Sequence, residues 1–352
     1  MSATPEITRL EVASHETVLR VHDGALGLTG FIALHSTHRG PAAGGLRMRA
    51  YASEDAALTD ALRLSEGMTY KNAAAGLPLG GGKAVIMGDP ATKTPDQLRA
   101  FARAIDTLGG RYWTAEDMGM SPADMAVMAG ETRFVAGLPD GKFASGDPSP
   151  ITARGIFNAI RITARHRLGS DDLTGRRVAV QGLGHVGAHL CDLLNRAGTR
   201  LIVADIDAAR VAETQARYGA ETATADGILA VEADILAPCA IGAILNADTI
   251  PTLRVAAVAG GANNQLATPE DGARLHDRGI LYAPDFVANG GGIINVATEI
   301  LAIEDRAGFV DEKLAALEVT MDRILTRAAQ TNRSPDAVAT AIVDEMPQAR
   351  AA

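Results

Sequence analysis

The 352-residue sequence has few cysteines, no excess of positive charge and no long apolar run. Cys191 and Cys239 are too few for a disulfide framework, and their apolar surroundings predict buried, reduced thiols. The net charge of -9 argues against a nucleic-acid partner, which usually needs a basic surface. No apolar stretch approaches the ~20 residues that span a bilayer, and the N-terminus lacks a targeting pattern. We therefore expect a cytoplasmic protein with no membrane partner.

The composition is that of a globular protein, with 47% hydrophobic and 21% charged residues. The length allows two domains, since one domain commonly takes about 100–200 residues. Short apolar runs alternate with helical patterns as far as Gly146, and Gly137–Pro150 is rich in glycine and proline. In the first part, Ser53 is expected to cap a helix that ends near Gly76. We predict a mixed α/β substrate-binding and oligomerisation domain over 1–146.

The second part reads as a doubly wound parallel sheet, because strand-like runs alternate with helices. The predicted strands are Val178–Leu183, Leu201–Ile206, Asp234–Ala237, Val255–Ala259 and Ile280–Ala283. We expect this Rossmann domain to cover 147–325, with a cleft between the two domains. Asp311–Ala329 is amphipathic, and a C-terminal helix over about 326–352 is expected to pack back on the first domain.

A dinucleotide fingerprint of the form G-x-G-x-x-G follows the first of these strands. By itself such a hexapeptide is a weak signal, but here it opens a helix and an acidic residue, Asp205, ends the next strand. The glycines permit a tight turn, close approach of the pyrophosphate and helix packing, and the helix N-terminus attracts phosphate. The predicted cofactor-binding residues are Gly182, Leu183, Gly184, His185, Val186 and Gly187.

Asp205 bears on the choice of cofactor. A carboxylate at this point accepts hydrogen bonds from a ribose 2′-hydroxyl and repels a 2′-phosphate. The sequence therefore predicts NAD rather than NADP.

Two lysines lie among alanines and glycines in Met68–Lys83, twelve positions apart at Lys71 and Lys83. A phosphate-binding P-loop does not fit, because Leu77 stands where its first glycine is needed and Ala84 replaces its Ser or Thr. A desolvated lysine can serve in proton transfer or carbonyl polarisation, whereas a solvated lysine has no such role, and the pattern leaves both open.

Two further polar segments are candidates for the same chemistry. Asp117, in Thr114–Gly119, is either an acid–base group or one of two acids on a surface turn. Asn263, Asn264 and Gln265 follow a predicted parallel strand at its carboxyl end, where ligands bind in such sheets. No metal-ligand spacing is found in the sequence.

At these residues the chain resembles the glutamate/leucine/phenylalanine/valine dehydrogenase family, and within it the leucine enzymes. The similarity spans nearly the whole chain and includes Gly40–Met48, Met68–Lys83, Thr114–Gly119, Gly146–Thr152, the Gly182 fingerprint, Asn263–Leu266 and Tyr282–Val296. It implies reversible, NAD-dependent oxidative deamination of an apolar L-amino acid to its 2-oxo acid and ammonia. It also implies a homo-oligomer.

The resemblance implies a role for each matching residue. Lys71 and Asn264, helped by backbone at Gly44 and Gly45, would hold the substrate carboxylate. Lys83 would polarise the developing carbonyl and activate the attacking water, and Asp117 would shuttle protons to and from the substrate nitrogen. Thr152 and Asn289 would help to place the nicotinamide.

The family's side-chain pocket maps onto four apolar residues, which are Ala43, Ala115, Ile293 and Val296. Glutamate enzymes place a cation near the position of Ala43, so a dicarboxylic substrate is disfavoured. Leucine enzymes tend to carry leucine there, and the smaller alanine leaves an aromatic substrate, phenylalanine or tryptophan, as the alternative. A catalytically silent NAD(H)-binding regulator is a remote alternative, because such a protein need not keep Lys71, Lys83 and Asp117 together.

Overall fold

The computed structural model describes residues 5–345, which divide into two compact units. Unit 1 contains the described residues up to Pro148 together with Ile293–Phe309. Unit 2 contains Ser149–Gly292 and the described residues from Val310 onwards. The first division falls two residues after the predicted boundary at 146, inside the predicted glycine- and proline-rich join. No helix among residues 5–345 is long and apolar enough to cross a membrane.

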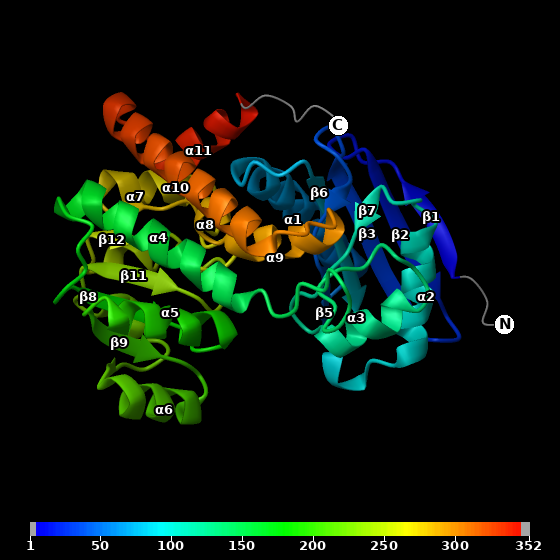
Figure 1. The fold of residues 1–352 in the computed structure, drawn as a ribbon, viewed down its shortest axis with the longest axis horizontal. Coiled ribbons are helices and arrows are strands. Elements are labelled where there is room, and N and C mark those ends of the chain that lie inside the picture. Colours follow the sequence, from blue (N-terminus) through cyan, green and yellow to red (C-terminus); the bar gives the residue numbers. More distant parts are fainter. Residues whose placement is uncertain (1–4, 346–352) are drawn as a thin grey trace. The chain divides into compact units, whose positions relative to one another are not determined.

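Unit 1 is built on a mixed sheet in the order β1-β2-β3-β6-β4-β7, with β5 also paired to β6 (Figure 1). Strands β1, β2, β3 and β6 are antiparallel neighbours, whereas β4, β5 and β7 join in parallel. The strands are β1 (Glu6–Leu10), β2 (Thr17–Asp23), β3 (Leu28–Ser36), β4 (Ala42–Ala43), β5 (Leu46–Arg49), β6 (Gly80–Met87) and β7 (Tyr112–Trp113). The helices are α1 (Glu54–Ala74), α2 (Pro95–Asp106), α3 (Pro122–Ala129) and α9 (Gly291–Ile300), which begins in unit 2, with a 3-10 turn over Pro90–Thr92.

The alternation of side chains along β3 and β6 explains how this sheet is covered on both faces. Phe31, Ala33 and Val85 pack with Ala57 and Ala61 of α1. The intervening residues of the same strands join a larger core with α2, which contains Ile32, Leu34, Ala84, Ile86, Leu98 and Phe101. Because successive side chains of a strand point to opposite faces, one face packs on α1 and the other on α2. The strand that carries Lys83 is therefore held against α1.

Helix α1 has the boundaries expected from its sequence. The Ser53 side chain accepts a hydrogen bond from the Ala56 amide at 3.1 Å, which satisfies one free donor of the first turn. Gly76 follows the helix end with φ +62°, a conformation that glycine adopts at little cost. These two signals confirm the predicted helix from Ser53 to Gly76.

Unit 2 is a six-stranded parallel sheet in the order β10-β9-β8-β11-β12-β13, the order of a dinucleotide-binding fold. The strands are β8 (Arg177–Gln181), β9 (Arg200–Ala204), β10 (Glu221–Thr222), β11 (Ile235–Pro238), β12 (Ala257–Val258) and β13 (Leu281–Tyr282). The helices are α4 (Ser149–Leu168), α5 (His185–Arg196), α6 (Ala208–Tyr218), α7 (Glu270–Asp277), α8 (Asp285–Ala288), α10 (Arg306–Thr331, which begins in unit 1) and α11 (Pro335–Asp344), with 3-10 turns over Ile228–Ala230 and Ile250–Thr252. The five predicted strands and the doubly wound topology are confirmed.

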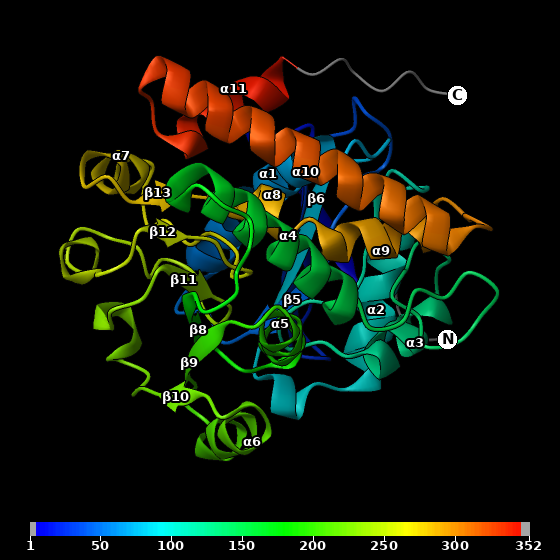
Figure 2. The same cartoon turned by 60° about the vertical axis from the view of Figure 1, so that its left-hand side comes forward.

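The C-terminal helices differ from the expectation that they return to the first domain. Figure 2 shows α10 running along α4, and a small hollow between them is lined by Ala159, Ile162, Leu317 and Met321. Helix α11 contacts α7 and β13. The apolar stripe of α10 therefore finds its partner in unit 2, and the rest of the predicted helix, 346–352, lies outside the described residues.

Residues 293–309 also differ, because they belong to unit 1 although the sequence predicted them in the Rossmann domain. One oxygen of Glu299 accepts hydrogen bonds from the amides of Gly137, Leu138 and Ser145 at 2.8, 3.3 and 3.0 Å, and from the Ser145 hydroxyl at 2.8 Å. Arg306 donates to the carbonyl of Ala144 at 3.1 Å. These bonds tie α9 and the first residue of α10 to the segment 137–145, and no local sequence signal encodes them.

The Glu299 contacts predict a measurable contribution to the stability of unit 1. Glu299→Ala should lower the free energy of unfolding by about 1–3 kcal/mol, because it leaves partly buried amides without an acceptor. The measurement is urea unfolding followed by the fluorescence of Trp113, the only tryptophan of the sequence, which lies in β7. Glu304→Ala is the matched control, since its ion pair with Lys142 is exposed, and equal midpoints for both variants would contradict the prediction.

Candidate active site

Lys83 is a buried lysine in the middle of the unit 1 sheet. It lies on β6 opposite Ala33 of β3, and only 3% of its surface is exposed. The preceding glycines allow neighbours to come close to this strand. A side-chain carbon at Gly81 would lie 2.0 Å from the Thr69 hydroxyl of α1, and one at Gly82 would lie 2.7 Å from the Tyr112 ring. The glycine run therefore brings helix and aromatic ring onto the strand immediately before Lys83.

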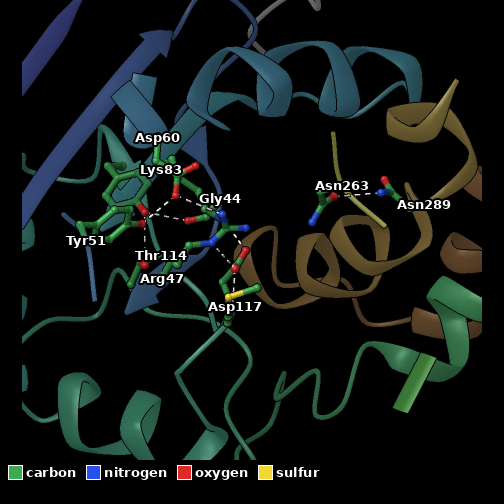
Figure 3. Close-up of polar contacts among 11 residues, drawn as sticks. Gly44, Arg47, Tyr51, Asp60, Lys83, Thr114, Asp117, Asn263 and Asn289 are labelled. Carbon is green, nitrogen blue, oxygen red and sulfur yellow. Dashed lines mark hydrogen bonds and ion pairs between the residues drawn. The ribbon is translucent and has the colours of Figure 1, made fainter. Parts of the chain in front are cut away.

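Asp117 supplies the counter-charge for Lys83. Its Oδ2 forms an ion pair with the Lys83 ammonium, and its Oδ1 accepts hydrogen bonds from the Met118 amide at 2.6 Å and from Arg47 Nε at 3.1 Å (Figure 3). Sequence reasoning left open whether Asp117 lies on a surface turn. The structure places it against Lys83 with 17% of its side chain exposed.

Burial and nearby charge shift the protonation equilibria of this pair. Burial lowers the pKa of Lys83, and the positive charge of Arg47 lowers it further, against the attraction of Asp117. Burial would raise the pKa of Asp117, but the charges of Lys83 and Arg47 outweigh that effect and hold the pKa below its ordinary value. Before substrate binds, the carboxylate is therefore ionised, while the amine is shifted toward its neutral form.

The glycines at 44 and 45 mark a close crossing of backbone segments beside this pair. A side-chain carbon at Gly44 would lie 1.9 Å from the Gly82 carbonyl oxygen, and one at Gly45 would lie 2.6 Å from the Glu116 carbonyl oxygen. The Gly44 amide donates to the Trp113 carbonyl at 3.2 Å, so its own hydrogen-bonding capacity is used within the sheet. The required feature at both positions is thus the absence of a side chain.

Lys71 lies in the last turn of α1 and is half-buried. Its neighbour Asn72 is fully buried and donates to the carbonyls of Ala43 at 3.3 Å and Gly80 at 2.5 Å. These two bonds attach the end of α1 to β4 and β6. The structure thus places Lys71 in the same unit as Lys83 and Asp117, on the helix that covers β6.

All four predicted side-chain pocket residues are buried in unit 1. The exposed fractions are 0% for Ala43, 6% for Ala115, 8% for Ile293 and 6% for Val296. Gly137 links the segment of Ala115 to α9. A side-chain carbon at Gly137 would lie 3.9 Å from the Ala115 methyl, and the Gly137 amide donates to Glu299 of α9.

The fingerprint of unit 2 forms a tight turn at the N-terminus of α5. Gly182 has φ +93°, and a side-chain carbon at Gly187 would lie 1.9 Å from the Gly182 carbonyl oxygen. Within the part of the chain that the structure describes, a side-chain carbon at Gly184 would meet only Arg210 Nη1, at 3.9 Å. The fold itself thus requires glycine at 182 and 187, whereas Gly184 borders open space at the N-terminus of α5, where a phosphate fits.

The other fingerprint positions and Asp205 belong to the same loop. Leu183 is buried, Val186 is half-buried and His185 is exposed at the first position of α5. Asp205 follows β9, and its two oxygens accept hydrogen bonds from the amides of Leu183 at 2.6 Å and Asp207 at 2.8 Å. Asp205 therefore shapes the fingerprint loop and keeps lone pairs for a further donor.

Asn289, one of the residues predicted to bind the nicotinamide, is buried in unit 2. Asn289 is 4% exposed and donates to Asn263 Oδ1 at 2.9 Å and to the Gly261 carbonyl at 3.2 Å, while its own Oδ1 has no hydrogen-bond partner among the described residues (Figure 3). An orphaned acceptor of this kind fits the amide donor of a nicotinamide. Thr152 is buried in the first turn of α4.

The three polar residues after β12 have different environments. Asn263 and Asn264 are exposed, and Asn264 has φ +51°, which asparagine tolerates better than most residues. Gln265 is fully buried and donates to the carbonyls of Gly260 at 2.9 Å and Ala262 at 3.1 Å. Gln265 thus holds the loop, whereas the two asparagines lie at its surface.

Sequence reasoning missed Arg47, Asp60 and Tyr51. Arg47 Nη1 donates to Asp60 Oδ2 at 3.1 Å, and the Tyr51 hydroxyl donates to the same oxygen at 2.7 Å. A signal for Arg47 was present, because an arginine between the buried Leu46 and Met48 of a strand needs a charged partner. No comparable signal marks Asp60, which looks like one more acid on an amphipathic helix.

Comparison with known proteins agrees with both units. Residues 11–134 match the model of the Glu/Leu/Phe/Val dehydrogenase dimerisation domain, and residues 203–348 match the Glutamate/Leucine/Phenylalanine/Valine dehydrogenase model. Leucine dehydrogenase of Geobacillus stearothermophilus is 50% identical over 83% of this chain and 80% of its own. The chain belongs to the glutamate/leucine/phenylalanine/valine dehydrogenase family. Its members are NAD(P)-dependent enzymes that act on the CH–NH₂ group of amino acids.

Aromatic relatives are also similar to this chain. Phenylalanine dehydrogenase of Caldalkalibacillus thermarum is 42% identical over 98% of this chain and 94% of its own. The crystal structure of L-tryptophan dehydrogenase from Nostoc punctiforme superposes with a TM-score of 0.79, at 39% identity over 94% of this chain and 95% of that chain. The predicted family and two-domain α/β fold are confirmed by these comparisons.

The open space beside Gly184 predicts a substitution that separates cofactor binding from folding. Gly184→Ala should raise the Kd for NADH by about tenfold or more, because a methyl group would take up the space of the pyrophosphate. The thermal midpoint should stay unchanged, since no atom of the described residues fills that space. The measurements are NADH fluorescence titration and thermal unfolding. Gly67→Ala is the control, as its added carbon meets no atom within 4 Å, and an unaltered Kd for Gly184→Ala would refute this location of the phosphates.

Proposed function

We propose that this protein catalyses the reversible, NAD⁺-dependent oxidative deamination of an apolar L-amino acid of the leucine, valine or isoleucine type. The observation that carries the proposal is the buried pair of Lys83 and Asp117, whose pKa values are both lowered. An ionised carboxylate beside an amine shifted toward neutrality is the arrangement that proton transfer at the substrate nitrogen and water activation require. The leucine dehydrogenase relatives support the substrate class.

The proposed roles follow from the positions of the two charges. Asp117 takes and returns protons at the substrate nitrogen. Lys83 activates the water that attacks the imine carbon and stabilises the oxygen of the resulting carbinolamine, which collapses to the 2-oxo acid and ammonia. The fingerprint residues would hold NAD⁺, which would supply the acceptor for the hydride from the substrate Cα. Both protein groups are held on strand or strand-flanking backbone, which keeps them in place before the substrate arrives.

The carboxylate-binding and cofactor-binding residues remain part of the proposal. We retain Lys71 and Asn264 as the groups that hold the substrate α-carboxylate, with the close backbone approach at Gly44 and Gly45. The fingerprint Gly182–Gly187 would hold the pyrophosphate, and Thr152 and Asn289 would place the nicotinamide. The oxygen of Asn289, which has no hydrogen-bond partner among residues 5–345, supports its part in this arrangement.

The preference for NAD rests on Asp205, whose carboxylate disfavours a 2′-phosphate. Arg210 lies close to the fingerprint, since a side-chain carbon at Gly184 would be 3.9 Å from its Nη1. Arg210 is paired with Asp207 at 3.4 Å and is half-exposed, so we expect it to contact the cofactor less than Asp205 does. A homo-oligomer and a cytoplasmic location complete the proposal.

An aromatic L-amino acid is the second candidate substrate, favoured by Ala43. The family pattern places leucine there in leucine enzymes, and alanine leaves room for a larger side chain. The wholly buried Ala43 and the similarity to the tryptophan enzyme support this alternative. The other three pocket residues, Ala115, Ile293 and Val296, are apolar and suit either substrate class.

A substrate panel tests the proposed reaction. Purified protein with NAD⁺ should form NADH, read by its absorbance, with L-leucine or L-valine and not with L-glutamate. Faster turnover of L-phenylalanine or L-tryptophan would select the aromatic alternative. If no member of the panel gives NADH although the protein binds NADH measurably, the proposed enzymatic activity is overturned and the NAD(H)-binding regulator is favoured.

Removal of the Lys83 amine tests its role within the reaction. Lys83→Ala should lower kcat by about 10²-fold or more, because one preorganised charged group contributes about 3 kcal/mol to the transition state. The Kd for NADH should remain that of the wild type, since Lys83 lies in unit 1 and the fingerprint lies in unit 2. Near-normal turnover by this variant would be incompatible with the proposed role.

The cofactor preference is tested by steady-state kinetics with NAD⁺ and NADP⁺. We expect kcat/KM to be at least about tenfold higher with NAD⁺, because the carboxylate of Asp205 lies where a 2′-phosphate would add negative charge. Asp205→Asn removes that charge and should narrow the ratio. A wild-type preference for NADP⁺ would reverse the assignment.

A further inference from the structure

Arg47 is a buried cation that the proposed reaction does not yet explain. It lies on β5 with 8% of its surface exposed, between Leu46 and Met48, which are 0% and 2% exposed. A guanidinium loses much solvation in such a position and is stable only with charged partners. Arg47 has two of them, Asp117 Oδ1 at 3.1 Å from Nε and Asp60 Oδ2 at 3.1 Å from Nη1.

The second partner fixes the guanidinium from the side of α1. Asp60 belongs to α1, and its Oδ2 also accepts the Tyr51 hydroxyl at 2.7 Å. The Arg49 guanidinium lies 4.6 Å from the centre of the Tyr51 ring. Burial raises the pKa of Tyr51, and its hydrogen bond to Asp60 raises it further, so the phenol remains a donor. The orientation of Arg47 is therefore set by a helix and a loop as well as by its own strand.

The two oxygens of Asp117 have separate tasks because of this arrangement. Oδ1 accepts from Arg47 Nε and from the Met118 amide, while Oδ2 faces the Lys83 ammonium. We propose that Arg47 is a positioning residue for the deamination, which orients the Asp117 carboxylate so that Oδ2 is presented to Lys83, with Asp60 and Tyr51 as its support. This proposal rests on the proposed function for its effect on turnover.

The same geometry sets the sign of a pH effect. Besides each other, Asp117 and Lys83 interact electrostatically with Arg47 on β5, Asp60 on α1 and Tyr112 on β7. The positive charge of Arg47 lowers the pKa of Lys83, whereas the negative charge of Asp60 raises it. Loss of Arg47 therefore favours the ammonium form of Lys83, and loss of the charge on Asp60 favours the neutral amine.

The test compares Arg47→Met, Arg47→Lys and Asp60→Asn by the pH dependence of kcat/KM with NAD⁺ and the preferred amino acid. Arg47→Met should lower kcat by about tenfold or more. It should also move the acid limb of the pH profile of kcat/KM to higher pH, because a smaller fraction of Lys83 is neutral at a given pH. Asp60→Asn, which keeps the shape of the side chain, should move the limb to lower pH. Arg47→Lys restores the charge without the two-pronged contact, so the limb should return toward the wild-type position while kcat stays reduced.

A second readout does not depend on turnover. The sequence contains only five lysines, Lys71, Lys83, Lys93, Lys142 and Lys313, so ε-¹³C-lysine NMR can follow Lys83 once Lys83→Ala has assigned its signal. Its titration midpoint should rise in Arg47→Met and fall in Asp60→Asn. Arg103→Met is the matched control, because it breaks a partly buried ion pair of unit 1, Arg103 with Glu131 at 3.2 Å, and should move neither readout.

The outcomes separate the two proposals. The role of Arg47 is overturned if Arg47→Met leaves both the acid limb of the pH profile and the Lys83 titration midpoint unchanged. This conclusion requires that the variant keeps the wild-type thermal midpoint and Kd for NADH. The role is also overturned if the pH profile and the Lys83 midpoint shift in the same direction in Arg47→Met and Asp60→Asn. A shift that does not depend on the sign of the removed charge indicates a general loss of packing. Should Arg47→Met fail to fold, Arg47→Lys and Asp60→Asn decide by the same criteria. A wild type without turnover overturns the proposed function, and the NMR midpoints then still decide whether Arg47 sets the state of Lys83.

Discussion

The burial of the Lys83 charge is the constraint on which the rest of unit 1 depends. An ammonium that is 3% exposed has lost nearly all contact with water, and removal of one partner from such a pair commonly costs about 3–5 kcal/mol. Asp117 balances the charge of Lys83, Arg47 balances the charge of Asp117, and Asp60 forms a second ion pair with Arg47. Each further charge comes from a different segment, so the ion network also joins β5, β6, α1 and the segment after β7.

Several features of the sequence acquire a physical reason from this constraint. The glycines at 81 and 82 let α1 and Tyr112 approach the strand immediately before Lys83, which is 3% exposed. Asn72 attaches the end of α1 to the sheet, which keeps Lys71 close to the strand that carries Lys83. A lysine surrounded by small residues is thus the result of close packing, and the low dielectric that follows makes each remaining charge more effective.

Unit 2 has the features of a dinucleotide-binding fold. Its parallel sheet places Asp205 and the fingerprint at the carboxyl ends of strands, where main-chain amides and a helix N-terminus could bind an anionic ligand. The fold requires glycine at 182 and 187, whereas no close contact among residues 5–345 requires glycine at 184. That contrast is the strongest internal sign that the loop is shaped for a ligand.

The sequence by itself determined what depends on neighbours along the chain. Helix α1 follows from the Ser53 cap and Gly76, the parallel sheet from alternating strands and helices, and the fingerprint from six consecutive residues. Long-range packing decided the rest. The sequence did not indicate that α10 and α11 cover unit 2, that Glu299 joins α9 to the segment 137–145, or that Asp60 stabilises Arg47. Those contacts join residues 13 to 162 positions apart, and an acid on an exposed helix face looks the same in sequence as one whose partner arrives from another strand.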